Sequence, residues 1–151
     1  MADIPVETRE MIGLEKVTTY EVTRKDIKRF AQAIDDPNPM FRDDGSEQVA
    51  PPLFCHALAF EDVELENLLP DGSPAELNVP LPAEKTVGGG SVFEVFGHVR
   101  PGDRITVKSK IADVYTKQGR SGTLFFVVVE TSFYNQNREM VSKETATFIK
   151  R

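Results

Sequence analysis

The chain has little of several features that mark large classes of proteins. Its 151 residues contain one cysteine, Cys55, and two histidines, His56 and His98. A single cysteine excludes an internal disulfide, and so small a set of metal-binding side chains argues against a structural zinc site. No stretch approaches the roughly 18 consecutive apolar residues that a transmembrane helix needs. We therefore expect a globular protein with neither a metal nor a membrane as partner.

Positive charge is also scarce. Lys and Arg number 18 against 24 Asp and Glu, which gives a formal net charge of −6 and argues against a protein that coats nucleic acid. The distribution is uneven, because residues 1–99 carry 8 basic and 19 acidic side chains, whereas residues 100–151 carry 10 basic and 5 acidic. The basic C-terminal third could attract a phosphate-bearing ligand or an acidic partner, or could be a solvated sheet face with interspersed lysines.

The remaining composition is typical of one domain with a hydrophobic core. Hydrophobic residues make up 40% of the chain and charged residues 28%, which is ordinary for a soluble protein of this length. The first residues, Met1 to Glu7, have neither a basic start nor an apolar signal region, and the lone cysteine fits a reducing compartment. We expect a single domain over residues 1–151, located in the cytoplasm.

Two segments in the first half of the chain have helical periodicity. Thr23-Arg24-Lys25-Asp26 resembles a capping box, and the apolar residues after it predict a short amphipathic helix from about Lys25 to Ile34. Prolines at 37 and 39 end this helix because they remove backbone donors. A second helix is expected to open at Pro51-Pro52 and to run from Leu53 to about Leu68, apolar nearly all round in its first half. Its apolar stripe comprises Phe54, Ala57, Leu58, Leu65 and Leu68.

The second half of the chain predicts a sheet. The segment from Leu124 to Val129 is apolar on both faces, as in a central strand covered by a helix on one side and by a second subunit or layer on the other. Helices followed by consecutive hairpin-linked strands predict an α+β domain in which a long antiparallel sheet curls around one buried helix. The expected strands are Val92 to Val99, Ile105 to Tyr115, Leu124 to Tyr134 and Met140 to Ile149.

Several motifs resemble those of the MaoC-like dehydratases. They are Asp36-Pro37-Asn38-Pro39, Ala50-Pro51-Pro52-Leu53-Phe54, Val99-Arg100-Pro101-Gly102-Asp103 and the run from Asp113 to Thr131. From about Val17 to Arg151 the chain looks most like the N-terminal, FAS1-like dehydratase domain of that hot-dog superfamily. The resemblance implies an antiparallel sheet wrapped around one long central helix, usually in a dimer. It also implies acyl thioesters of coenzyme A or acyl carrier protein as ligands, and no cofactor.

The resemblance further implies a hydratase motif, which is incomplete here. Active members interconvert trans-2-enoyl and (R)-3-hydroxyacyl thioesters with a motif of the form Asp-x-Asn-Pro-apolar-His. Asp36 falls on the acid and Asn38 on the amide, but Phe41 falls on the histidine. A phenyl ring cannot titrate, and one unperturbed carboxylate cannot readily serve as both base and acid at pH 7. Asp36 could equally cap the turn that follows it.

The start of the buried helix departs from the family pattern as well. Active relatives have a His-Gly pair there, which leaves backbone N–H groups free to hold the thioester oxygen. This chain has Pro51-Pro52, and proline has no N–H. We therefore expect that the chain alone is not catalytic, and that Pro51, Pro52 and Phe54 contribute to substrate binding. Arg100 and Arg120 are the basic residues that we predict to contact the substrate.

The two histidines are the candidates for replacing the missing imidazole. His56 lies one turn into the expected helix, although a lone histidine on a mostly apolar helix is more often a satisfied core or interface group. His98 precedes the turn at residues 100–103 and is the weaker candidate. The glycine-rich stretch from Val87 to Ser91 lacks the features of a P-loop and predicts a flexible entry or a bulge.

Two functions of different classes remain open. The chain is either a subunit of a hetero-oligomeric (R)-specific hydratase or dehydratase, or a homodimeric acyl-CoA-binding protein without chemistry. In the first case it would pair edge to edge with a second hot-dog chain that keeps the catalytic Asp and His, and would shape part of the acyl tunnel. A third possibility, a hot-dog thioesterase, would need a carboxylate beside the buried helix, for which Glu61 is the candidate.

Overall fold

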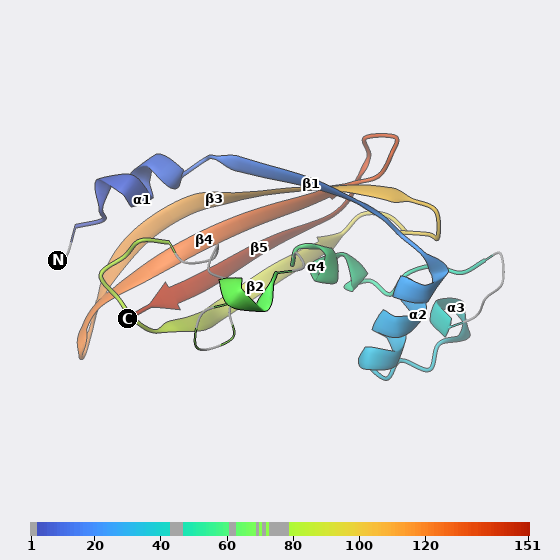
Figure 1. The fold of residues 1–151 in the computed structure, drawn as a ribbon, viewed down its shortest axis with the longest axis horizontal. Helices are drawn as coiled ribbons and strands as arrows, with labels where there is room; N and C mark the ends of the chain where they lie inside the picture. Colours follow the sequence, from blue (N-terminus) through green and yellow to red (C-terminus); the bar gives the residue numbers. More distant parts are fainter. Residues whose placement is uncertain (1–2, 43–46, 61–62, 69, 71, 73–78) are drawn as a thin grey trace.

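A five-stranded antiparallel sheet forms the body of the molecule (Figure 1). The computed structural model describes residues 3–42, 47–60, 63–68, 70, 72 and 79–151. The strand order is β1-β3-β4-β5-β2, so that β4 is central and β1 and β2 are the edges. The strands are β1 (Glu15–Glu21), β2 (Thr86–Val95), β3 (Arg104–Gly119), β4 (Gly122–Tyr134) and β5 (Met140–Lys150).

The helices are short and lie on one side or at the ends of this sheet. In Figure 1, α4 lies along the sheet, while α2 and α3 pack together beyond one of its ends. No helix in the described part of the chain is long and apolar enough to cross a membrane. The helices are α1 (Val6–Met11), α2 (Arg24–Ala33), α3 (Pro39–Arg42), α4 (Phe54–Leu58) and the 3-10 helix η1 (Leu65–Asn67).

Helix α2 confirms the capping box that the sequence predicts. The Thr23 hydroxyl accepts a hydrogen bond from the Asp26 backbone N–H at 3.2 Å, and the Thr23 N–H donates to Asp26 Oδ2 at 3.0 Å. The two bonds satisfy donors that a helix start leaves unpaired. The apolar face of the helix is buried at Ile27 and Ala31.

Helix α4 is much shorter than the helix predicted from Leu53 to Leu68. It spans five residues, Phe54–Leu58, and the three residues Leu65–Asn67 form a separate 3-10 turn. The reason lies in the acidic stretch between them, since Glu61 and Asp62 interrupt the apolar stripe and a short helix gains most of its stability from packing. Leu65 confirms this, because it is 84% exposed instead of buried.

The four predicted strands occur in the predicted order along the chain, but not every boundary agrees. Strand β4 is central, as its two apolar faces predict. Strand β2 begins at Thr86, earlier than the predicted Val92, and a register shift between Gly88 and Gly90 makes the glycine stretch a bulge within it. Strand β1, which pairs with β3, was not predicted. The α+β class with an antiparallel sheet is confirmed.

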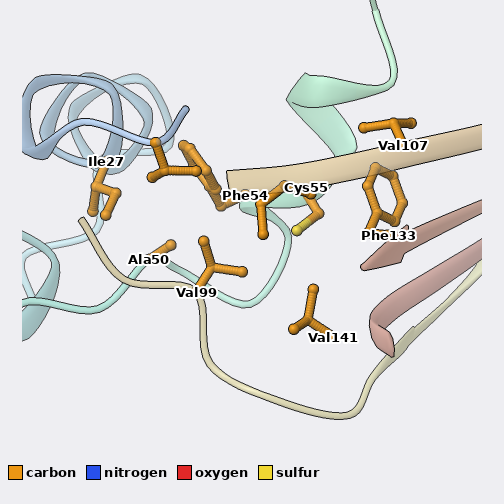
Figure 2. Packing of buried hydrophobic residues seen from close by; sticks show 10 residues of the cluster. Ile27, Ala50, Phe54, Cys55, Val99, Val107, Phe133 and Val141 are labelled. Atoms are coloured by element: carbon orange, nitrogen blue, oxygen red, sulfur yellow. The ribbon is translucent and has the colours of Figure 1, made fainter. Parts of the chain in front are cut away.

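The main hydrophobic core joins the helices to one end of the sheet (Figure 2). Phe54 and Cys55 of α4 meet Val107 of β3, Phe133 of β4 and Val141 of β5 in this cluster. Figure 2 shows these side chains converging from separate elements. The core therefore fixes where α4 and the segment before it lie relative to β5.

A matched pair of phenylalanine substitutions tests this core. Phe133 is 0% exposed, whereas Phe96 is 57% exposed. We expect Phe133→Ala to lower the free energy of unfolding by about 3–5 kcal/mol, because it leaves a cavity, and Phe96→Ala to change it by less than about 0.5 kcal/mol. Urea denaturation of both variants measures this, and equal losses would contradict the core as described.

Candidate functional site

A cavity of about 240 Å³ opens where α3, the segment before α4, the end of β2 and the start of β5 meet. Its wall is mostly apolar, with Met40, Val49 and Val95 among the lining residues. Three polar side chains, Asn38, His98 and Ser142, also line it. An apolar cavity with a few polar groups is the usual form of a small-molecule site.

The Asp36-Pro37-Asn38-Pro39 turn brings part of the predicted motif to this cavity. Asp36 Oδ1 accepts a hydrogen bond from the Asn38 N–H at 2.9 Å, and Asn38 Oδ1 accepts one from the Met40 N–H at 3.0 Å. These bonds hold the turn that leads into α3. Asn38 and Phe41 line the cavity, whereas Asp36 is not among its lining residues.

Pro51 and Pro52 line the same cavity from the other side. Neither has an N–H, and the N–H of Phe54 is already bonded to the carbonyl of Pro51 at 2.9 Å. The N–H of His56 is likewise bonded to the carbonyl of Leu53, at 3.0 Å. At these four positions the start of α4 therefore has no free backbone N–H for a ligand, which increases the importance of side-chain donors.

Cys55 and Ser142 form the buried floor of the cavity, from α4 and β5. Cys55 is 3% exposed and Ser142 is 2% exposed. Burial raises the pKa of the Cys55 thiol to about 11, against a smaller opposite effect of the Ser142 hydroxyl. At pH 7 the sulfur is a neutral, weakly bonding thiol, unsuited to act as a nucleophile.

His56 is held by a buried carboxylate on the sheet. Its Nδ1 lies 2.8 Å from Oε2 of Glu144, and the Glu144 side chain is 6% exposed. A carboxylate can only accept a hydrogen bond, so Nδ1 carries the proton. The ring also meets Phe60 edge-on, with centroids 5.1 Å apart. His56 is not among the cavity residues, and its side chain, which is 46% exposed, is the outer member of the pair with the buried Glu144.

Three of the predicted substrate contacts, Phe54, Arg100 and Arg120, are not among the residues that line the cavity. Phe54 is 3% exposed in the core cluster, because its face of α4 points at the sheet. Arg100 is exposed in the turn before β3, where its N–H donates to Asp103 Oδ2 at 2.8 Å. Arg120 lies in the hairpin turn at the start of β4, and the 13 residues of that strand separate it by about 40 Å from the end near the cavity.

The structure also brings in residues that sequence reasoning ranked low or missed. His98 reaches the cavity because the N–H groups of Phe96 and Gly97 both donate to the Val141 carbonyl, at 2.8 and 3.1 Å. This contact joins residues more than forty positions apart, so no local pattern reveals it. Ser142 and Glu144 are buried on either side of the half-buried Lys143, and this two-residue spacing is the signal that could have placed both on one face of β5.

The comparisons with known proteins agree with this architecture. Residues 10–144 match the family described as FAS1-like, dehydratase domain region. A UPF0336 protein of Thermobifida fusca is 31% identical over 107 residues, which cover 66% of this chain and 66% of that protein. The match thus covers about two thirds of the full length of that relative.

Solved structures share the fold at lower identity. The R-hydratase PhaJ1 of Pseudomonas aeruginosa matches with a TM-score of 0.65 at 20% identity, over 96% of this chain and 85% of that one. The HadBC (3R-hydroxyacyl-ACP dehydratase) complex of Mycobacterium tuberculosis matches with a TM-score of 0.66 at 22% identity, over 92% of this chain and 96% of that one. The fold is the hot-dog fold, and the chain belongs to the FAS1-like dehydratase family of MaoC-like proteins.

The pairing of His56 with Glu144 gives a prediction for stability. His56→Ala should lower the free energy of unfolding by about 1–3 kcal/mol, because it leaves a buried carboxylate without its partner. The matched control is His98→Ala, since His98 is exposed and has no hydrogen bond with the described residues, and it should change stability by less than about 0.5 kcal/mol. Chemical denaturation compares the two, and equal effects would show that the pair contributes nothing.

The buried thiol gives a prediction for pH. The folded pKa of Cys55 is raised from 9.0 to about 11, so the folded state keeps a proton that the unfolded state releases in this range. The wild type should therefore lose stability as pH rises from about 9 towards 11, beyond the loss seen in Cys55→Ala, which has no thiol to titrate. Urea midpoints at pH 8 and pH 10 measure this. Parallel pH profiles of the two proteins would show that the thiol is not buried as described.

Proposed function

We propose that the chain is a cytoplasmic subunit of an (R)-specific enoyl-thioester hydratase or 3-hydroxyacyl-thioester dehydratase, and that its own site is not catalytic. The observation that carries the proposal is the cavity that holds Asn38 and Phe41 together. Asn38 is the retained amide of the hydratase motif, and Phe41 occupies the position of its histidine. The family membership of the chain supports hydro-lyase chemistry as its class.

The reaction explains why the missing imidazole matters. Dehydration of a 3-hydroxyacyl thioester requires a base for the C2 proton and an acid for the departing hydroxyl. Asp36 is the only carboxylate of the motif, its Oδ1 is bonded to the Asn38 N–H, and it does not line the cavity. Phe41 cannot carry a proton. In this proposal the proton-transfer groups come from a second hot-dog subunit that keeps the Asp and the His.

This chain would contribute the wall of the acyl tunnel. The cavity is large enough for the acyl thioester end of a ligand and too small for the whole of an acyl-CoA, which extends beyond it to solvent or to the partner. Its apolar lining from Val49, Val95 and Val141 suits an acyl chain. The ligand class is an acyl thioester of coenzyme A or of acyl carrier protein.

The edge strand β2 is the surface through which we propose that the partner pairs. An unpaired edge offers backbone groups to another strand. Strand β2 also exposes apolar side chains at Val92, which is 62% exposed, and Val95, which is 48% exposed, with Phe96 following at 57%. The similar HadBC structure is a complex of dehydratase chains, which supports a hetero-oligomer.

The alternative is a homodimer that binds acyl-CoA without turnover. The same observations support it, since Asp36 is engaged in its turn and Phe41 lies in the cavity. A thioesterase would need Glu61, which lies outside the described residues.

The decisive test follows the ultraviolet absorbance of a short enoyl-CoA. The chain alone should leave the enoyl signal unchanged, because it lacks a titrating group at residue 41. When the chain is added to a catalytic hot-dog partner, the turnover rate should exceed the rate of the partner alone. Turnover by the chain alone would contradict the noncatalytic assignment, and a failure of every candidate partner to gain activity would favour the homodimer.

A matched pair of edge substitutions makes the test specific for β2. Val92→Arg places a charge on the β2 edge strand and should abolish the gain in turnover, because it desolvates an arginine in the interface. Val17→Arg places the same charge on the opposite edge strand β1, where Val17 is 52% exposed, and should leave the gain unchanged. Loss of the gain in both variants, or in Val17→Arg alone, would contradict pairing through β2.

A further inference from the structure

The cavity contains a buried hydroxyl that nothing in the described part of the chain satisfies. The Oγ of Ser142 has no hydrogen-bond partner within that part, and the residue is only 2% exposed. The Cys55 thiol borders the same cavity, but it is neutral and bonds weakly. Leaving a buried donor unsatisfied costs about 1–3 kcal/mol, so such a group in a native structure calls for a reason.

The position of Ser142 supplies that reason. Ser142 is one of the residues that line the cavity, together with Cys55, Asn38 and Phe41. The prolines at the start of α4 remove the backbone N–H groups that would otherwise hold a carbonyl oxygen there. A donor on β5, one strand in from the edge, is therefore placed where the cavity is short of donors.

Asn38 provides a second donor on the same cavity. Its Oδ1 accepts a hydrogen bond from the Met40 N–H at 3.0 Å, so that the Nδ2 end of the amide remains as the donor. The amide Nδ2 makes no hydrogen bond with any described residue and can donate two. Two donors in a mostly apolar cavity match an acceptor oxygen with two lone pairs, as a carbonyl has.

We propose that the Ser142 hydroxyl and the Asn38 side-chain amide bind the carbonyl oxygen of the acyl thioester, in place of the backbone N–H groups that Pro51 and Pro52 cannot supply. This inference rests on the proposed function for the identity of the ligand. It adds the residues that hold the reacting carbonyl, one of which lies on a strand that the hydratase motif does not include. Ser142 is thereby a substrate-binding residue.

The test compares two ligands that differ only in the carbonyl. Butyryl-CoA carries the thioester, whereas the thioether S-butyl-CoA lacks the oxygen. Isothermal titration of the full-length chain should show that Ser142→Ala weakens butyryl-CoA binding by about twofold to tenfold, the value of one hydrogen bond, and leaves S-butyl-CoA binding unchanged. Isotope-edited infrared spectra of bound butyryl-CoA should also show the carbonyl stretch at a lower frequency in the wild type than in Ser142→Ala.

The matched control is Ser109→Ala. Ser109 is a serine on the same face of the sheet, its hydroxyl lies 3.1 Å from that of Thr131, and it does not line the cavity. Its loss should leave both affinities unchanged. The thermal midpoint of unfolding is the control for the fold. Ser142→Ala should leave this midpoint unchanged or raise it, because the alanine removes an unpaired hydroxyl. Ser109→Ala breaks a hydrogen bond and should lower the midpoint slightly.

The outcomes separate this inference from the function on which it rests. Selective loss of butyryl-CoA affinity in Ser142→Ala supports the inference. Equal loss of both ligands, no loss of either, or a lowered thermal midpoint in Ser142→Ala would overturn it while leaving acyl-CoA binding established. Failure of the wild-type chain to bind either ligand would overturn the proposed function and the inference together.

Discussion

The packing of α4 against the start of β5 is the contact on which the rest of the site depends. Phe54 anchors the helix in the core, and His56 is held by Glu144 at 2.8 Å. Cys55 lies between them, over Ser142. Because α4 has only five residues, these contacts and not helix propensity must hold it in place. Their position fixes Pro51 and Pro52 as one wall of the cavity and Ser142 as its floor.

The chemistry of the cavity follows from what those walls contain. In the motif resemblance, Pro51 and Pro52 stand where active relatives have a His-Gly pair, and Phe41 stands where they have a histidine. What the cavity has is an apolar lining and a few polar side chains, to which the proposed function assigns the binding of an acyl group. Binding without proton transfer is the property expected of a subunit that shapes a site and relies on a partner for the reaction.

The elements with strong local signals were predicted from the sequence. The capping box at Thr23 and the double apolar face from Leu124 to Val129 each determined an element correctly, because both signals depend on neighbouring residues. The length of α4 was not predicted, because Leu65 and Leu68 keep the helical spacing in the sequence beyond the interruption at Glu61 and Asp62. Strand β1 also escaped notice because its side chains are mostly exposed and carry no alternation of apolar residues.

The site was only half predictable for the same reason. Asn38 stands in one short sequence motif, Pro51 and Pro52 stand in another, and all three residues line the cavity. His98 and Ser142 arrive there through the pairing of β2 with β5, and Glu144 meets His56 across 88 positions of sequence. Arg120 looked plausible because charge alone suggested it, and charge says nothing about which end of a strand a residue occupies.

Hydrogen exchange in the presence of a short acyl-CoA tests the central claim, that this cavity is the acyl-thioester site of the chain. The account predicts slower exchange with ligand at the amides that border the cavity, in residues 38–41, 49–55, 95–99 and 141–142. The amides around Arg120, at the far end of β4, should exchange at the same rate with and without ligand. Protection confined to the hairpin around Arg120, with no change at the cavity, would contradict the account.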